Sequence, residues 1–476
     1  MKINPELQAL VQDLLGEEAE DFWNAVGQPP KTVIRVNTLK TTPLALRKRL
    51  ERAGFALTEL PLAIPAFRVE EEPFPIGKTF EHFVGLFYVQ SLASLLPPLA
   101  LAPQPADWVL DIAAAPGSKA TELAQLMDNH GLLVANDVSP SRMRALVHNV
   151  ERLGIVNTGL MQQDGNRLGR CFRETFDRAL VDVPCSALGT LGKSPEVTQR
   201  WMWRQATRLA QGQYQLLLSA AHTLRVGGTL VYSTCTLTPQ ENEGVISSFL
   251  RKYPFEVASL HFASVPTRPG LTQFGGETFD ERVARAVRLY PFEAETEGFF
   301  IAKLVKTDSL PPVPAARTPR EVSWRPLEAD DSQVHPLLTA LEERYGLPST
   351  VWEPYLFGRR KDELWLLSRG WAEGPRELME RVGMRVARRY RERAWRLTTG
   401  GAQLLAPFIT RQVVDLRSGE ELLQFVAGGT VDAPPDLRGP VVARYDGLIV
   451  GSGVVTPTGL KGQVPRSRRF EFFPPS

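Results

Sequence analysis

The sequence has very little cysteine: only three cysteines occur in 476 residues. Such a low and odd number does not suit a disulfide framework of the kind that stabilises small secreted domains. We therefore expect the protein to work in a reducing compartment, the cytoplasm. The first residues also lack the apolar segment of an export signal, which favours the same expectation.

Long hydrophobic runs and a strong net charge are missing as well. No stretch of about 18 apolar residues occurs, so we expect no membrane-spanning helix. The net charge is +2, a total that indicates nothing about a nucleic-acid partner. An apolar fraction of 43% and a charged fraction of 23% are typical of a soluble globular protein. A chain of 476 residues predicts two to four domains.

Basic residues are nevertheless concentrated in one segment. Between Arg381 and Arg396 the chain has seven arginines against one acidic residue, Glu392. Such a run can neutralise the phosphates of a nucleic acid. It is equally compatible with the solvated face of a helix that Val386 and Trp395 anchor to a core. The sequence leaves both interpretations open.

The beginning of the chain, residues 1–100, predicts a small α+β module. Residues 33–38 have the composition of a strand. Thr42, followed by proline, caps a helix that closes at Gly54. An apolar helix at residues 91–99 forms the joint to the next part of the chain.

Residues 101–306 alternate short strands with helices, which predicts an α/β domain with a Rossmann-like, mostly parallel sheet and helices on both faces. Ligands of such sheets bind beyond the carboxyl ends of the strands. The predicted strands are residues 108–112, 132–136, 158–162, 176–182 and 229–233, and the predicted helices are residues 119–127, 140–153 and 203–224.

The remaining residues divide into a linker and a C-terminal region. Residues 307–330 include a proline-rich stretch and read as a linker. Residues 331–476 mix strands and helices without a catalytic signature. Within them, residues 441–445 and 448–450 flank Asp-Gly, which predicts a β-hairpin.

A cofactor site is predicted at the first strand of the α/β domain. The strand is followed by a turn of small residues that opens a helix, so that backbone N–H groups can approach a ligand closely. Asp137 ends the second strand, where a carboxylate can accept hydrogen bonds from both hydroxyls of a ribose. Asp164 ends the third strand and suits the amino group of an adenine. Each aspartate alone can also be a helix cap, but three at successive strand ends, with Asp182, favour a shared ligand.

The turn lacks Gly-x-Gly-x-x-Gly, and nothing after it resembles a cradle for a pyrophosphate. A dinucleotide is therefore disfavoured. S-adenosylmethionine, which has a ribose and an adenine but no phosphate, fits the pattern better.

Two of the three cysteines follow strands of the same sheet. Cys185 lies in Asp-Val-Pro-Cys after residues 176–182, and Cys235 lies in Ser-Thr-Cys after residues 229–233. Most free cysteines are small buried apolar residues, and either of these alone would favour that interpretation. As a pair at the ligand-binding strand ends, they indicate nucleophilic chemistry. Cys171 has no such context, and we expect it to be structural.

On these motifs, residues 107–303 resemble the Sun-type (RsmF-like) RNA cytosine-5 methyltransferases. The resemblance rests on the cofactor turn, the segment of Asp137 and Arg142, and the two cysteine motifs. It extends to matching segments at residues 35–38, 88–90, 241–242 and 297–300, and it extends to the bacterial ribosomal-RNA branch at residues 361–366 and 459–461. Proteins of that branch end in a PUA-like RNA-binding module, so the resemblance implies a C-terminal PUA-like region here.

The resemblance implies roles for individual residues. Cys235 would be the nucleophile that attacks C6 of cytosine, and Cys185 would assist release of the covalent adduct. Asp182 would hold the edge of the base close to the cofactor's methionine, and Lys119 would support the cofactor or the cytosine. The implied cofactor-binding residues are Ala113, Ala114, Ala115, Pro116, Gly117, Ser118, Lys119, Asp137, Arg142, Asp164 and Asp182.

The chain also departs from the family's pattern. Ser118 and Ala187 stand where glycine is usual, residues 188–193 lack an acidic and a basic residue often found there, and Phe292 replaces a frequent histidine. These departures put the exact RNA target in doubt. We expect a monomeric, metal-free enzyme that binds RNA, most of all small-subunit (16S) ribosomal RNA. Transfer RNA as substrate, or an inactive RNA-binding assembly factor, are the alternatives.

Overall fold

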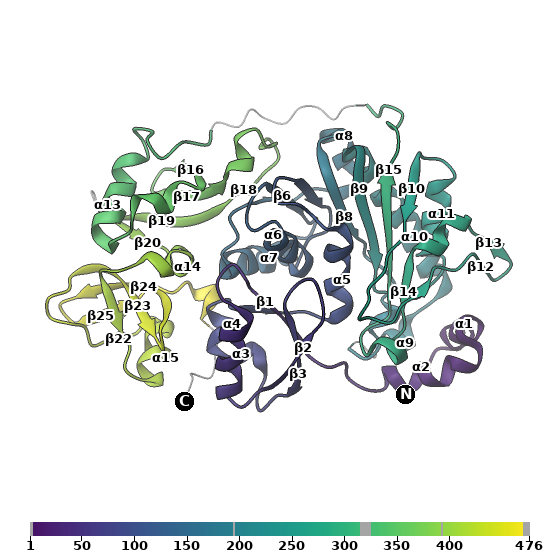
Figure 1. Cartoon of the computed structure of the whole chain (residues 1–476), viewed down its shortest axis with the longest axis horizontal. Coiled ribbons are helices and arrows are strands. Elements are labelled where there is room, and N and C mark those ends of the chain that lie inside the picture. The colour runs from purple at the N-terminus through teal and green to yellow at the C-terminus, as the bar shows by residue number, and fades with distance from the viewer. Residues whose placement is uncertain (1–2, 194–195, 315–324, 392–393, 470–476) are drawn as a thin grey trace.

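The protein is described by a computed structural model that covers residues 3–193, 196–314, 325–391 and 394–469 (Figure 1). Its centre is a ten-stranded sheet with strand order β11-β14-β15-β9-β8-β5-β6-β7-β18, in which β10 also pairs with β15. The five strands β5 to β9 run parallel, as predicted. They are β5 (Trp108–Asp111), β6 (Leu132–Asn136), β7 (Thr158–Met161), β8 (Phe176–Asp182) and β9 (Leu224–Thr234).

Strand β9 begins five residues before the predicted start, directly after helix α10 (Trp203–Thr223). Its first residues pair with the beginning of β8 through a register shift. Antiparallel strands extend the sheet beyond β9. They are β10 (Phe255–Ala258), β11 (Arg268–Pro269), β14 (Val287–Leu289) and β15 (Phe299–Lys306).

Helices cover both faces of the sheet, because neighbouring residues of a strand point to opposite faces. Val109 packs with helices α5 (Leu92–Leu101), α6 (Ser118–Leu126) and α7 (Pro140–Leu153) on one face. Leu110 packs with α10 and α11 (Glu243–Leu250) on the other. This confirms the predicted Rossmann-like α/β core. No helix in the described ranges is long and apolar enough to cross a bilayer.

The N-terminal residues form two units. Helices α1 (Pro5–Leu15) and α2 (Ala19–Val26) pack against the central domain, where Phe22 lies in one core with Leu188 and Trp201. A four-stranded antiparallel sheet of order β2-β3-β1-β4 follows. Its strands are β1 (Val33–Val36), β2 (Ala56–Leu60), β3 (Ala66–Glu71) and β4 (Phe87–Val89).

The predicted helix cap in this unit is confirmed. Helix α3 (Pro43–Arg52) begins after Thr42, whose hydroxyl accepts a hydrogen bond from the N–H of Ala45. The chain leaves the helix through Gly54 in a left-handed conformation (φ 90°). Glycine reaches that region without the steric cost of a Cβ atom, which is why it marks the end of the helix.

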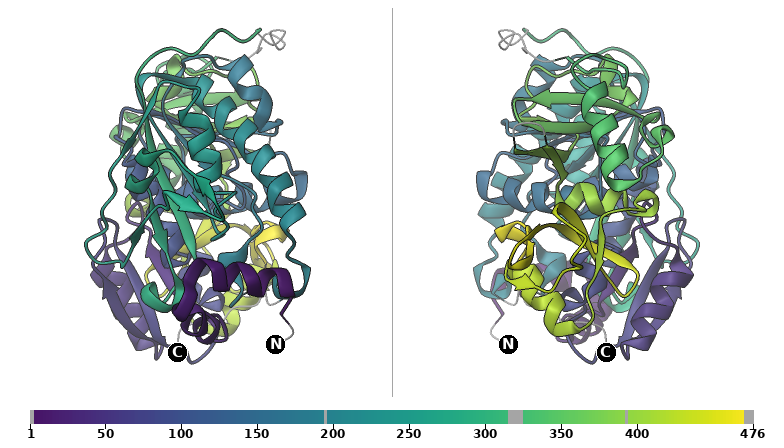
Figure 2. Two further views of the ribbon diagram at one scale, coloured as in Figure 1. Left: turned by 90° about the vertical axis from the view of Figure 1, so that its right-hand side faces the viewer. Right: turned by 90° about the vertical axis from the view of Figure 1, so that its left-hand side faces the viewer.

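The C-terminal residues form two further sheets, which the right-hand view of Figure 2 shows in green and yellow. The first has strands β16 (Tyr355–Arg360), β17 (Glu363–Ser368), β19 (Met384–Arg391) and β20 (Ala394–Leu397). The second has strands β21 (Val413–Asp415), β22 (Thr430–Val431), β23 (Gly439–Tyr445), β24 (Leu448–Thr456) and β25 (Gly459–Gly462). Helices α13 (His335–Tyr345), α14 (Thr399–Leu404) and α15 (Gly419–Ala427) accompany them. Strands β23 and β24 confirm the predicted hairpin.

The arginine-rich segment is not helical. It forms β18 (Arg381–Val382), β19 and β20, and β18 pairs with β7 at the edge of the central sheet. Apolar Val382, Met384, Val386 and Ala387 are buried in this segment, and their packing outweighs any helical tendency. The helix interpretation was therefore wrong. Part of the predicted linker, residues 315–324, lies outside the described residues.

Candidate active site

The turn after β5 is shaped for close approach of a ligand. Gly117 has φ 109°, and a Cβ atom there would lie 2.8 Å from the side chain of Leu146. Helix α6 begins at the next residue, so its first N–H groups face the edge of the sheet where β5 ends. The predicted cofactor turn, residues 113–119, is therefore present and requires glycine at this position.

Asp137 and Arg142 join this turn to the end of β6. The buried Asp137 carboxylate accepts hydrogen bonds from the N–H of Ala115 (3.3 Å) and of Ser139 (2.9 Å). Arg142 lies 3.1 Å from the same carboxylate and also donates to the carbonyl of Ala115. The structure therefore places the predicted ribose segment against the cofactor turn.

A cleft of about 470 Å³ lies over these strand ends. Asp137, Arg142 and Asp164 all line it, as does Pro184 beside Cys185. Asp164 also caps a short 3-10 helix, since its carboxylate accepts from the N–H of Asn166 (3.1 Å). Asp164 can therefore cap this turn and also face a ligand. Asp137, Arg142 and Asp164 share the cleft, whereas the turn at residues 113–119 and Asp182 are not among its lining residues.

Asp111, the last residue of β5, was not among the predicted site residues. Its carboxylate is buried, and neither oxygen has a hydrogen-bond partner of good geometry among the described residues. Burial, together with the charge of Asp182, raises the pKa of Asp111 to about 7, although Lys119 opposes the shift. A buried acid with so few hydrogen bonds fits a cationic group of a ligand. Its only signal in the sequence is an acidic residue ending an apolar strand.

Lys119 and Asp182 form an ion pair between α6 and the end of β8. Lys119 Nζ lies 2.8 Å from Asp182 Oδ2, and Ser233 Oγ donates to the other carboxylate oxygen at 2.7 Å. Burial disfavours the charged form of Lys119, but the Asp182 carboxylate outweighs burial and the pKa of Lys119 lies above its ordinary value. The pair therefore presents polar groups at the end of β8 that can meet the edge of a base.

The two predicted cysteines are brought into contact. Cys185 Sγ and Cys235 Sγ lie 3.2 Å apart, and both residues are half-buried. The hydrogen bond with Cys235, followed by burial, raises the pKa of the Cys185 thiol well above its ordinary value. A protonated Cys185 can thus donate a hydrogen bond to the sulfur of Cys235. Cys171 lies on α8 (Leu168–Cys171) and packs against the apolar core, as expected of a structural residue.

The loops that carry the thiols are fixed by buried polar contacts. Glu241 accepts hydrogen bonds from the N–H of Ser186 (2.9 Å) and from Gln213 (2.8 Å), next to Cys185. Asn242 accepts from Thr234 Oγ1 (2.7 Å), next to Cys235. The matching segment at residues 241–242 thus positions both thiols without contacting them. Burial raises the pKa of Glu241.

Arg35, in one of the N-terminal segments that match the family, connects the N-terminal sheet to the start of α6. Its buried guanidinium donates to Gln90 Oε1 and the carbonyl of Ser118 (both 2.9 Å) and to Thr121 Oγ1 (2.8 Å). It therefore ties the N-terminal sheet to the start of α6, beside the cofactor turn. Glu122 completes the cluster, and burial raises its pKa to about 8.

This combination of a parallel sheet, acidic strand ends, a small-residue turn and no pyrophosphate cradle defines a class, the Rossmann-fold methyltransferases that use S-adenosylmethionine. Residues 98–305 match the family model for the 16S rRNA methyltransferase RsmB/F, and residues 3–92 match that for the N-terminal domain of 16S rRNA methyltransferase RsmF.

Comparison with known proteins shows the same relationship over most of the chain. Ribosomal RNA small subunit methyltransferase F of Aeromonas hydrophila is 33% identical over 469 residues, which cover 94% of this chain and 93% of that protein. A methyltransferase homologue from Pyrococcus horikoshii is 38% identical, with a TM-score of 0.57, and the match covers 64% of this chain and all of that one. NSun6 from the same organism, solved with SFG, is 26% identical with a TM-score of 0.57 over 64% of this chain and 99% of its own. The chain belongs to the RsmF family of methyltransferases.

Proposed function

We propose that this protein methylates C5 of cytosine in small-subunit ribosomal RNA through a covalent bond between Cys235 and C6. The observation that carries the proposal is the contact of two thiols, 3.2 Å apart, beside the Lys119–Asp182 pair. The names of the relatives supply the substrate, since those proteins are ribosomal RNA small subunit methyltransferases.

The chemistry needs a nucleophile because C5 of cytosine is only weakly nucleophilic. A thiolate at Cys235 adds to C6, a C6–S bond forms, and the electron pair becomes available at C5. Asp182 and Lys119 hold the N3/N4 edge of the ring, and protonation there favours the addition. The base must first leave its stack, because the reacting atoms are covered inside a helix.

The cofactor residues fit S-adenosylmethionine. Asp137 and Arg142 would hold the ribose and Asp164 the adenine, since all three line the cleft. The turn at residues 113–119 would hold the methionine part, and the buried carboxylate of Asp111 suits its cationic ammonium group. When bound, S-adenosylmethionine supplies an electrophilic methyl group to C5. Every contact named here leaves the thiols free to act on the base.

Cys185 acts in release of the product. After methylation C5 carries a methyl group and a proton, and loss of that proton returns an electron pair to the ring and expels the thiolate of Cys235 from C6. Cys185 assists this elimination either as a thiolate, the base that takes the C5 proton, or as a thiol, the acid that protonates the departing sulfur of Cys235. The bond broken is the C6–S bond, so Cys235 is regenerated.

The regions on either side of the catalytic domain, residues 1–100 and 331–476, bind the RNA. Arg388 of β19 lies directly opposite Arg396 of β20, a pairing of like charges that is unfavourable in a sheet without an anion between them. Arg396 also reaches Gln463 of the last sheet at 2.8 Å. Arg396 is buried and Arg388 is exposed, so a phosphate group of the RNA backbone at Arg388 would relieve the repulsion, which favours the phosphate-binding interpretation of the arginine-rich segment.

We divide the chain accordingly into an RNA-binding module at residues 1–100, a catalytic domain at 101–306, a linker at 307–330 and an RNA-binding region at 331–476 that ends in a PUA-like domain. The protein acts as a monomer in the cytoplasm, where ribosomal RNA is present.

Methyl transfer from labelled S-adenosylmethionine tests the proposal. Purified small ribosomal subunits, free 16S RNA and transfer RNA are offered separately, and bisulfite sequencing locates the product. We expect label in the small-subunit RNA and 5-methylcytosine at a defined site. Transfer to transfer RNA alone would establish the other substrate, and no transfer to any RNA would indicate an assembly factor without activity.

A further inference from the structure

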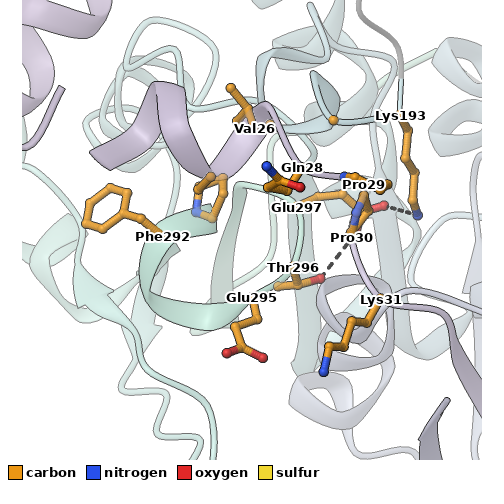
Figure 3. Close-up of a pocket in the computed structure, with 14 residues that line it drawn as sticks. Val26, Gln28, Pro29, Pro30, Lys31, Lys193, Phe292, Glu295, Thr296 and Glu297 are labelled. Carbon is orange, nitrogen blue, oxygen red and sulfur yellow. Dashed lines mark hydrogen bonds and ion pairs between the residues drawn. The ribbon is translucent and has the colours of Figure 1, made fainter. Parts of the chain in front are cut away.

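A second cavity lies behind the nucleophile. It has a volume of about 290 Å³ and is formed by three chain segments (Figure 3). These are residues 25–31 at the end of α2, residues 189–193 after Cys185, and residues 291–297 before β15. The lining residues include neither thiol and none of the predicted cofactor-binding residues. The cavity is therefore distinct from the site described above.

Backbone hydrogen bonds connect the wall of this cavity to the loop of Cys235. The N–H of Gly189, in its wall, donates to the carbonyl of Cys235 at 2.9 Å, and the N–H of Gly298 donates to the carbonyl of Gly189 at 2.9 Å. Strand β15 starts at this edge of the sheet, where Phe300 pairs with Thr234 at the end of β9. The cavity thus lies at the edge where a target base meets Cys235, one loop away from it.

The lining combines flat apolar surfaces with a charged pair. Pro29, Pro30 and Phe292 supply the apolar part. Glu297, only 9% exposed, is paired with the ammonium of Lys193. Among the residues that the structure describes, its second oxygen receives one long hydrogen bond, of 3.4 Å from Thr296. Figure 3 shows Glu297 and Lys193 joined beside Pro30, with Phe292 towards the other end of the cavity. A largely buried carboxylate that retains accepting capacity is costly unless a ligand uses it.

We propose that this pocket binds a guanine of the RNA strand within two nucleotides of the target cytosine. The inference rests on the proposed function. The Watson–Crick edge of guanine presents two adjacent N–H donors and one carbonyl acceptor. Glu297 accepts from the donors and Lys193 donates to the carbonyl, while the proline and phenylalanine side chains cover the ring. Adenine, cytosine and uracil do not present two adjacent ring and amino donors beside a carbonyl.

Holding a neighbouring base assists the reaction. A strand anchored on both sides of an extruded base cannot restack easily, so the target cytosine stays at Cys235. Residues 188–193 and Phe292, where the sequence departs from the family's pattern, form or adjoin the wall of this pocket. That location makes the pocket a determinant of which cytosine is chosen.

Single-turnover methylation of short hairpin RNAs tests the proposal. Each of the two nucleotides on either side of the target cytosine is replaced in turn by every other base. We expect one position at which guanine is favoured by about tenfold or more over the other bases, as is typical of a bidentate base contact. In Glu297→Gln and in Lys193→Ala that preference falls to about twofold or less, while the other RNAs react at the rate seen with the unaltered protein.

A matched control lies at the other end of β15. Lys306 pairs with Glu174 at 3.0 Å, and Glu174→Gln breaks a lysine–glutamate pair of the same kind away from the pocket. This variant should keep the full preference for guanine. Glu297 is largely buried, so Glu297→Gln can also disturb folding. Lys193 is about half exposed, and Lys193→Ala therefore tests the same ion pair with less effect on folding.

Equal rates with every base at all four positions would overturn the proposal while leaving cytosine methylation intact. A preference that persists in both variants would overturn it as well. If no hairpin receives a methyl group at C5 of cytosine, the proposed function itself fails, and the pocket proposal falls with it.

Discussion

Asp111 is the residue whose charge we expect binding of the cofactor to affect most. Its carboxylate is buried at the end of β5 with no hydrogen-bond partner of good geometry among the described residues, and burial raises its pKa to about 7. Below that pH the acid is neutral, and above it the negative charge needs a cation nearby. The unfolded chain has an ordinary aspartate pKa near 4, so the cofactor-free protein loses stability as pH rises from about 4 to about 7.

Asp111→Asn is therefore expected to weaken binding of S-adenosylmethionine by about tenfold or more, since a charged buried contact is worth about 1.5–3 kcal/mol. In the unaltered protein, affinity should rise between pH 6 and 8 as Asp111 ionises. Titration calorimetry across this range checks both statements. An affinity that is independent of pH and unchanged by the substitution would show that Asp111 does not face the cofactor.

At the residue scale, the site residues that stand in short sequence motifs could be predicted. Cys185, Cys235, Asp182 and Lys119 stand in short contexts that can be read along the chain, and the structure brings all four together. Asp111 could not be predicted in the same way. Whether a carboxylate keeps or lacks a partner depends on side chains that arrive from distant segments.

Element β14 is joined to helix α11 by a buried ion pair. Arg288 makes two hydrogen bonds to Glu243, at 2.6 and 2.7 Å, and both side chains are fully buried. A third bond, at 3.1 Å, reaches the carbonyl of Leu237, two residues after Cys235. The pair therefore fixes the loop that follows the nucleophile to β14, near the antiparallel edge of the sheet.

Arg288→Met should lower the free energy of unfolding by about 3–5 kcal/mol, because Glu243 is left as an uncompensated buried charge. Urea unfolding measures the change. Arg47→Met is the matched control, since Arg47 pairs with Glu51 on an exposed helix face and should cost less than about 1 kcal/mol. Replacing Glu243 by leucine together with Arg288→Met should recover much of the loss. A loss below 1 kcal/mol in Arg288→Met would contradict this account.

At the element scale the parallel strands and their helices were predicted closely, because apolar strands alternate with amphipathic helices along this part of the chain. The arginine-rich segment was not. Its arginines suggested a helix face, whereas its buried Val386 and Ala387 belong to a strand that pairs with β17 and β20. This segment is a strand because it pairs with strands that are distant in the sequence, and no local sequence pattern indicates that pairing.

The whole molecule is held together by contacts that cross the sequence-predicted boundaries. Strand β18 extends the catalytic sheet, with Arg381 opposite Leu160. Trp371 is fully buried against the same sheet, and its indole N–H donates to the carbonyl of Asn157 at 2.9 Å. Chain length and a proline-rich stretch predicted a separate C-terminal region. They cannot predict that this region packs against the central sheet.

Trp371→Ala should therefore destabilise the catalytic domain as well as the C-terminal region, by about 3–5 kcal/mol. We expect hydrogen exchange to accelerate in β7 as well as in β16 and β17. Trp371→Phe, which keeps most of the apolar volume, should cost less. Faster exchange confined to the C-terminal strands would mean that the two parts unfold independently.

The most direct test of the whole account is covalent capture of RNA. Each variant is incubated with S-adenosylmethionine and small-subunit RNA and run on a denaturing gel. We predict that Cys185→Ala accumulates a protein–RNA adduct, that Cys235→Ala forms neither adduct nor product, and that Cys171→Ala behaves like the unaltered protein. An adduct trapped by Cys235→Ala, or free product formed at full rate by Cys185→Ala, would contradict the assignment of the two thiols.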